Sequence, residues 1–149
     1  MTSLLFSTDI RRQATGLAIV RIITGIIFMA HGGQKLFQYG LAGVTGSFTQ
    51  MGIPLPGITA PLVSILEFAG GFALIIGLLT RLVALGLVID MLGAILFVHL
   101  AGGFFLPAGY EFALTLLCTS LALVIGGPGR FSVDETIARR QAIRATAGR

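Results

Sequence analysis

Charged residues are scarce in this sequence. They make up 11% of the 149 residues, whereas a soluble domain carries about 25%. Hydrophobic residues make up 55%, and the mean hydropathy is +0.96. This composition leaves no room for a sizeable soluble domain, so the lipid bilayer is the expected surrounding of most of the chain.

Cysteine is nearly absent as well. Cys118 is the single cysteine, so the chain cannot form an internal disulfide, and its place in an apolar run predicts an inert buried thiol. The sequence has no Cys/His motif with metal-ligand spacing, no glycine-rich dinucleotide fingerprint and no phosphate loop. We therefore predict no metal site and no tightly bound nucleotide.

The net charge of +4 comes from arginines gathered near the ends of the chain. They are interpreted as topology signals and as contacts to anionic lipid head groups. Nucleic-acid binding is not expected, because no basic face is interleaved with aromatic residues. These residues are Arg11, Arg12, Arg130, Arg139, Arg140, Arg144 and Arg149.

Long apolar runs predict an all-α membrane protein, a bundle of four transmembrane helices. A segment at residues 1–15 precedes this membrane domain at 16–127, and a basic tail at 128–149 follows it. In the tail, Ser132 is expected to cap a short amphipathic helix with Asp134 and Glu135 in its first turn. The predicted spans are residues 16–37, 58–79, 82–101 and 108–125.

The connections between the spans predict the orientation. Almost all of the Lys and Arg residues lie before the first span, at Arg81 and in the tail, and the first and third connections hold none. This pattern predicts both termini in the cytoplasm of a bacterium, with the chain in its (inner) membrane. The first connection, residues 38–57, is rich in Gly, Pro, Ser and Thr and is predicted to be a loop with one short turn near residues 47–51. We expect Ile53, Pro54 and Leu55 in this connection to pack on the end of the bundle.

Pairs of glycines occur in or beside every span. Close helix packing is the favoured interpretation, because glycine lets two backbones approach each other in a membrane. The alternative is that Gly70 and Gly71, in the middle of the second span, leave room for a ligand.

Ionisable residues interrupt all four spans. Each costs about 2.5–3.5 kcal/mol at the centre of a membrane helix, so such residues usually have a function. Half of the six acidic residues lie at membrane depth. The ionisable residues in the spans are Arg21, His31, Lys35, Glu67, Asp90, His99 and Glu111.

A polar pocket open to the outside is the predicted site. His31 and Lys35 share a helix face, and Glu67 is expected to point inward towards them. Asp90 and His99 lie nine residues apart, which places them on opposite faces of an ideal helix. We therefore expect His99 in the pocket and Asp90 in an ion pair on another interface, with Arg21 as one candidate partner. The binding candidates are thus His31, Lys35, Glu67, His99 and Glu111, and the structural ion-pair candidates are Arg21, Asp90 and Arg81. Alternatively, the charges form only structural pairs such as Lys35–Glu111.

Several segments resemble the DoxX family of small four-helix membrane proteins. They are RIITGIIFMAHGGQKLF in the first span, MGIPLP, EFAGGFALIIGLLTR in the second span, FVH, GYE and GPGRFSVD, spread over residues 21–134. The resemblance implies a role near quinones or redox partner proteins, because the family takes its name from a quinone-linked oxidoreductase. The matching positions are Arg21, His31, Lys35, Glu67, Arg81, His99 and Glu111.

The leading hypothesis is a quinone- or amphiphile-binding subunit of a membrane-associated redox complex, with quinone as the implied cofactor and a redox protein as partner. In it, His31 and His99 hydrogen-bond the head group, Glu67 or Glu111 relays protons and Lys35 stabilises negative charge. Whether the subunit is itself catalytic stays open, and a homo-oligomer is compatible with the sequence. The rival hypotheses are a small transporter or exporter and a non-catalytic scaffold that anchors soluble redox enzymes.

Overall fold

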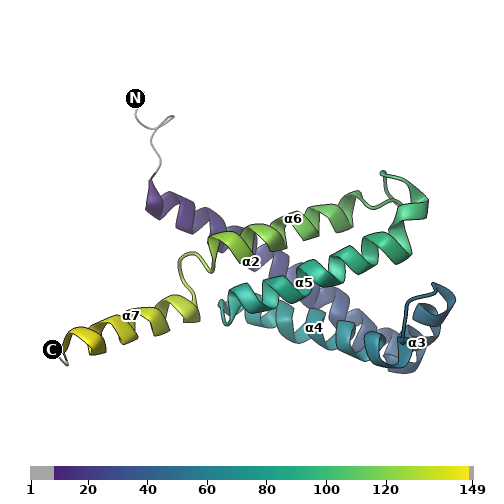
Figure 1. Ribbon diagram of the computed structural model, residues 1–149, viewed down its shortest axis with the longest axis horizontal. Coiled ribbons are helices and arrows are strands. Elements are labelled where there is room, and N and C mark those ends of the chain that lie inside the picture. Colours follow the sequence, from purple (N-terminus) through teal and green to yellow (C-terminus); the bar gives the residue numbers. More distant parts are fainter. Residues whose placement is uncertain (1–8, 148–149) are drawn as a thin grey trace.

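The computed structural model describes residues 9–147, which are helical almost throughout and contain no strand (Figure 1). Residues 1–8 of the predicted N-terminal segment, and Arg149, lie outside the described part. The elements are α2 (Ile10–Gly33), the π-helical η1 (Gln34–Tyr39), α3 (Gly40–Gln50), α4 (Pro56–Ile76), α5 (Thr80–Ala94), the π-helical η2 (Ile95–His99), the 3₁₀ turn η3 (Leu100–Gly102), α6 (Glu111–Gly126) and α7 (Val133–Ala147).

Three helical stretches are long and apolar enough to cross a membrane. They are Ile10–Gln50, Pro56–Ile76 and Thr80–Gly102, and Glu111–Gly126 is a shorter apolar helix. The first helix starts at Ile10, ahead of the predicted apolar run, because Asp9 caps it by accepting a hydrogen bond from Arg11 N at 2.8 Å. Hydropathy detects the membrane-embedded part of a helix, and the polar first turns lie outside that signal.

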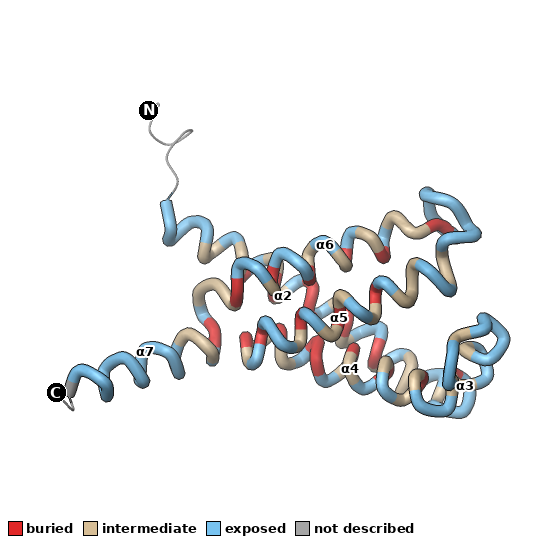
Figure 2. Tube along the Cα trace, in the orientation of Figure 1, coloured by how far each residue is buried: buried red, intermediate tan, exposed pale blue. Residues whose placement is uncertain are grey.

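The bundle is built from two helix pairs, α2 with α4 and α5 with α6, joined by contacts of α4 with α5 and of α2 with α6 (Figure 1). Buried residues gather in the middle of the bundle, whereas α7 is largely exposed (Figure 2). Phe28, Leu74 and Leu87 belong to this core. On α4, Leu62, Ile65 and Phe72 are exposed, so the outer face of the bundle is as apolar as a surface in contact with lipid should be.

Glycines bring α2 and α4 into backbone contact. A Cβ added at Gly25 would lie 2.7 Å from the carbonyl oxygen of Gly71, and one added at Gly71 would collide with the backbone of Met29. A Cβ at Gly70 would meet the Val83 side chain of α5 at 3.0 Å. Neighbouring helices therefore fill the space beside Gly70 and Gly71, and the alternative that these glycines leave room for a ligand is wrong.

The first connection is mostly helical, which the sequence did not predict. After η1, the chain continues as α3 and packs on α4, with Val44 buried. Glycine and threonine are weak helix formers, but tertiary packing of an apolar face overrides such propensities. Of the residues expected on the bundle end, Ile53 is half-buried, whereas Pro54 and Leu55 are exposed, so the expectation fails for these two.

The tail helix forms as predicted. In α7, Ser132 Oγ accepts a hydrogen bond from Glu135 N at 3.1 Å, which confirms Ser132 as the cap. Asp134 and Glu135 lie in the first turn. The helix leaves the bundle at the end opposite α3 (Figure 1).

Candidate functional site

Lys35, Glu67 and Asp90 form a cluster of ionisable side chains inside the bundle. Lys35 lies on η1 and is paired with Glu67 of α4. The Lys35 side chain is 22% exposed and that of Glu67 only 4%. Asp90 of α5 lies within hydrogen-bonding reach of Glu67 and interacts electrostatically with both partners. Three elements therefore contribute one ionisable group each, and we call these three residues the acid–base cluster.

The helix faces explain why these side chains meet. Ser64, Glu67, Gly71 and Leu74 follow one another at spacings of three and four residues, so they form the buried face of α4. A Cβ on Gly32 would collide with the backbone of α4 at Phe68, just beside Glu67. This close approach brings the next turn of the first helix, with Lys35, next to the Glu67 carboxylate.

The cluster confirms one prediction and corrects two pairings. Glu67 points inward to a polar group of the first span, as predicted. Lys35 does not pair with Glu111, whose Oε1 instead accepts a hydrogen bond from Leu106 N at 2.8 Å in the α5–α6 connection. Asp90 does not pair with Arg21: it faces Lys35 and Glu67.

The two histidines lie outside the cluster. His31 is exposed, its Nδ1 lies 2.9 Å from the carbonyl oxygen of Ile27 in its own helix, and its ring centroid lies 6.2 Å from that of Phe112 on α6. His99 Nδ1 lies 3.4 Å from the carbonyl oxygen of Ala108, in the α5–α6 connection. The five predicted binding residues therefore do not converge in one pocket: Lys35 and Glu67 meet, His31 lies near them on the first helix, and His99 and Glu111 hold the α5–α6 connection.

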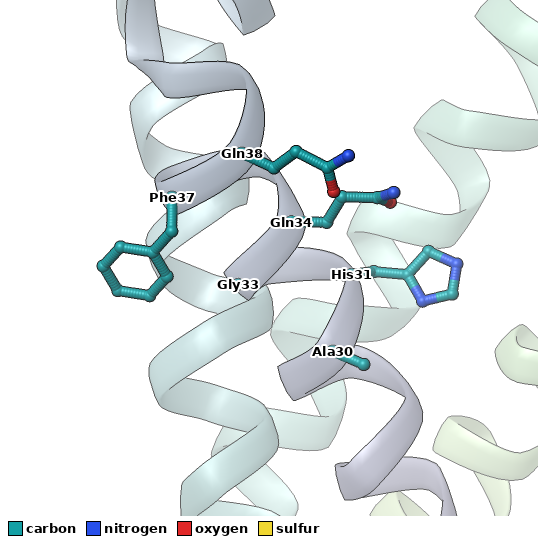
Figure 3. Close-up of a pocket in the computed structure, with 6 residues that line it drawn as sticks. All are labelled: Ala30, His31, Gly33, Gln34, Phe37 and Gln38. Atoms are coloured by element: carbon teal, nitrogen blue, oxygen red, sulfur yellow. The ribbon is translucent and has the colours of Figure 1, made fainter.

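Two glutamines that were not among the predicted site residues accompany His31. His31, Gln34 and Gln38 point to the same side of the helix, whereas Phe37 points to the other (Figure 3). Together with Ala30 and Gly33 these residues line an open, shallow pocket of about 660 Å³. The spacing of three and seven residues from His31 could have revealed this polar face.

A second polar centre holds the other end of the bundle together. Arg21 is fully buried on α2, and its guanidinium donates to the carbonyl oxygens of Pro128 at 2.8 Å and Phe131 at 3.0 Å. The Asp134 carboxylate accepts hydrogen bonds from Leu79 N at 2.8 Å and Thr80 N at 2.9 Å, at the start of α5. The segment 128–134, which we call the clasp, thus ties α2 to the α4–α5 turn.

Arg81 was predicted as an ion-pair residue, and the structure places it differently. Within residues 9–147 it forms no ion pair. A Cβ on Gly127 would lie 3.2 Å from its guanidinium, so Arg81 covers the glycine that precedes the clasp. In the same described range, no three His, Cys, Asp or Glu side chains lie close enough together to hold a metal ion.

Comparison with known proteins identifies relatives of the whole bundle. The DoxX family model matches residues 16–100. An uncharacterized membrane protein of Mycobacterium tuberculosis is 34% identical over 81% of this chain and 80% of its own length. "Putative oxidoreductase CatD" of Bacillus subtilis is 37% identical over 82% of this chain and 87% of its own length. Inner membrane protein YqjF of Escherichia coli is 34% identical over 86% of this chain and 96% of its own length. No solved structure matches the chain.

Proposed function

The chain belongs to the DoxX family and is a multi-pass protein of the inner membrane, and on this premise we propose that it binds a quinone or a similar amphiphile as a subunit of a membrane redox assembly. The name of the relative CatD, which contains the word oxidoreductase, agrees with a redox role.

The polar face of His31, Gln34 and Gln38 is the observation that carries this proposal (Figure 3). The two carbonyl oxygens of a quinone accept hydrogen bonds, and the side-chain amides of Gln34 and Gln38 are suitable donors. Phe112 of α6 lies beside His31, so the neighbouring surface offers an aromatic contact to an isoprenoid chain. Gln34 and Gln38 thus supply donors next to His31 on an exposed face of the helix.

We further propose four spans with both termini in the cytoplasm. The 16 residues of α6 rise about 24 Å, which is close to the thickness of the hydrocarbon core, and α6 packs along α5. The arginines in the first turn of α2, at Arg81 and on α7 favour the cytoplasmic side for that end of the bundle. The end that carries α3 and the His31 face then lies on the outer side.

Photolabelling with an azido-quinone tests the binding site. The purified full chain in lipid nanodiscs is illuminated with the probe, and labelled peptides are mapped by mass spectrometry. We expect label between residues 30 and 38 and on the facing part of α6, and competition by unlabelled quinone. Gln34→Ala should reduce the competable label several-fold, whereas Gln50→Ala, an exposed glutamine at the end of α3, should leave it unchanged.

Label spread evenly over the lipid-facing helices, without competition, would contradict the proposal. The scaffold hypothesis would then gain support, because the exposed arginines of α7 stand away from the bundle and are free to contact a soluble protein (Figure 1).

A further inference from the structure

We propose that the acid–base cluster is a proton-binding site, in which the carboxyl groups of Glu67 and Asp90 hold one proton between them while Lys35 balances the remaining charge. The inference goes beyond the proposed quinone site, and it stands whether or not a quinone binds. In the binding step one O–H bond of a hydronium ion breaks, an O–H bond to a carboxylate oxygen forms, and a water molecule is released; no oxidation state changes.

The charge count is the first argument. Lys35 supplies one positive charge, whereas Glu67 and Asp90 supply two negative charges if both are ionised. A net charge in the interior of a membrane bundle is costly, and two adjacent carboxylates repel each other. One proton makes the cluster neutral and turns this repulsion into a hydrogen bond.

An orphan atom is the second, independent argument. Asp90 Oδ2 is buried and has no hydrogen-bond partner among the residues that the structure describes. Buried carboxylate oxygens normally accept a hydrogen bond, and an orphan costs about 1–3 kcal/mol. Because the Glu67 carboxyl lies within reach of Asp90, a proton on either group provides the missing donor.

Several other charged side chains on the elements around Asp90 face other groups, and Arg81 of α5 itself lies about two and a half turns from Asp90, beside Gly127. On α2, Arg21 binds the clasp, and His31 Nδ1 faces its own helix at Ile27. On α6, Glu111 accepts from Leu106 N, and on η2, His99 faces Ala108. On η1 and α4, Lys35 and Glu67 are the groups that act on Asp90. Lys35, Glu67 and Asp90 therefore interact mainly with one another.

Lys35 provides the route for the proton. Its side chain is 22% exposed and that of Glu67 4%, so the cluster meets solvent or ligand through the lysine. In the proposed orientation this opening faces the outer side of the membrane. The site would thus exchange protons with the outside and not with the cytoplasm.

Infrared spectroscopy of the full chain in a maltoside detergent, which contains no carbonyl group, tests the site. We expect a protonated-carboxyl C=O band at pH 7 that shifts in D₂O. The band can be assigned because the other four acidic residues all have donors. Asp9 accepts from Arg11 N, Glu111 from Leu106 N, Asp134 from Leu79 N and Thr80 N, and Glu135 from Arg139.

Three variants and a control separate this proposal from a purely structural ion pair. Asp90→Asn and Glu67→Gln should each remove the whole band, because the remaining carboxylate then pairs with Lys35. Lys35→Met should increase the band up to about twofold, because two carboxyls remain without a cation. Glu111→Gln, a carboxyl outside the cluster, should leave the band unchanged.

A wild-type spectrum without a protonated-carboxyl band at pH 7 would overturn the inference, and this result needs no variant to fold. Persistence of the band in both Asp90→Asn and Glu67→Gln would overturn it as well, because the proton would then lie elsewhere. Quinone labelling is measured separately, so a failure of one proposal is distinguishable from a failure of the other.

Discussion

Arg21 holds backbone carbonyl groups and not a carboxylate. It is fully buried, its two terminal nitrogens donate to Pro128 and Phe131 at 2.8 and 3.0 Å, and its Nε has no partner. The planar guanidinium can hold two carbonyl groups at fixed positions, whereas the ammonium group of a lysine is a single compact charge. This geometry therefore requires arginine, and not lysine, at position 21.

Arg21→Lys should therefore destabilise the bundle. The variant loses one charged hydrogen bond and leaves a buried carbonyl without a donor, which costs about 1–3 kcal/mol. Unfolding of the detergent-solubilised protein, followed by circular dichroism, measures the loss. Arg139→Lys is the matched control, because Arg139 is 75% exposed and pairs only with Glu135 of its own helix. Equal stability of the two variants would refute the role given to Arg21.

The candidate site could be predicted at the level of single residues but not of pairs. Because a charge in lipid is costly, Lys35, Glu67 and Asp90 could be expected to have a functional or structural role. The position of Glu67 on its helix face predicted its inward orientation. The partners could not be predicted, because they depend on how far each helix rotates and on the π-helical segments η1 and η2. A π-helix changes the direction in which every later side chain points. The direction of His99 could therefore not be predicted from 3.6 residues per turn.

The α2–α4 contact is the tightest of the helix pairs at the level of the backbone. Gly71 lies against the backbone of Met29 and Gly25, so nothing flexible can move aside there. Gly71→Ala should push the two helices apart and cost about 1–3 kcal/mol. It should lower the unfolding temperature in detergent.

Gly93→Ala is the control for this prediction. Gly93 lies on α5, and an added Cβ meets nothing within 4 Å. Alanine is the better helix former by about 1 kcal/mol, so this variant should be neutral or slightly stabilising. If both alanine variants behave alike, the close backbone contact is not what holds α2 to α4.

Asp134 caps a helix that begins 54 residues before it along the chain. Its two carboxylate oxygens accept hydrogen bonds from the first N–H groups near the start of α5, and its own N–H donates to Gly77 O at 3.0 Å. Asp134→Ala should cost about 1–2 kcal/mol, because those N–H groups lose their acceptor. It should also speed limited proteolysis between residues 128 and 134.

Asp9→Ala serves as the comparison, because Asp9 caps the helix that directly follows it in the sequence. Asp9 accepts from Arg11 N, at the exposed start of α2. Its loss should leave the proteolysis of the clasp unchanged. If Asp9→Ala and Asp134→Ala open the clasp to the same extent, Asp134 is not the residue that docks it.

The helices themselves could largely be predicted from the sequence, because long apolar runs dominate it. Helix α3 could not, because its Gly- and Thr-rich sequence reads as a loop and only its packing on α4 stabilises it. The GPGRFSVD sequence that contains the clasp indicates the family but not a structural role. Its role depends on contacts between residues more than 50 positions apart, for which local sequence patterns carry no signal.

At the scale of the whole molecule, α6 decides the topology. Ser47 lies after the first span, and Thr146 lies after α4, α5 and α6. If all three helices cross the bilayer, the two residues lie on opposite sides of the membrane. If the short α6 does not cross, they lie on the same side.

Single-cysteine labelling distinguishes these cases. Cys118 is exposed on α6, so the expectation of a buried thiol is wrong, and it is first replaced by alanine. Either Ser47→Cys or Thr146→Cys is then introduced, and both of these positions are exposed. We expect a membrane-impermeant maleimide to label position 47 in intact spheroplasts and position 146 only after permeabilisation, because the arginines near the termini favour the cytoplasm. The reverse pattern would contradict the orientation. Labelling of both positions from one side would contradict the fourth span, and it would place the clasp and the His31 face on the same side of the membrane.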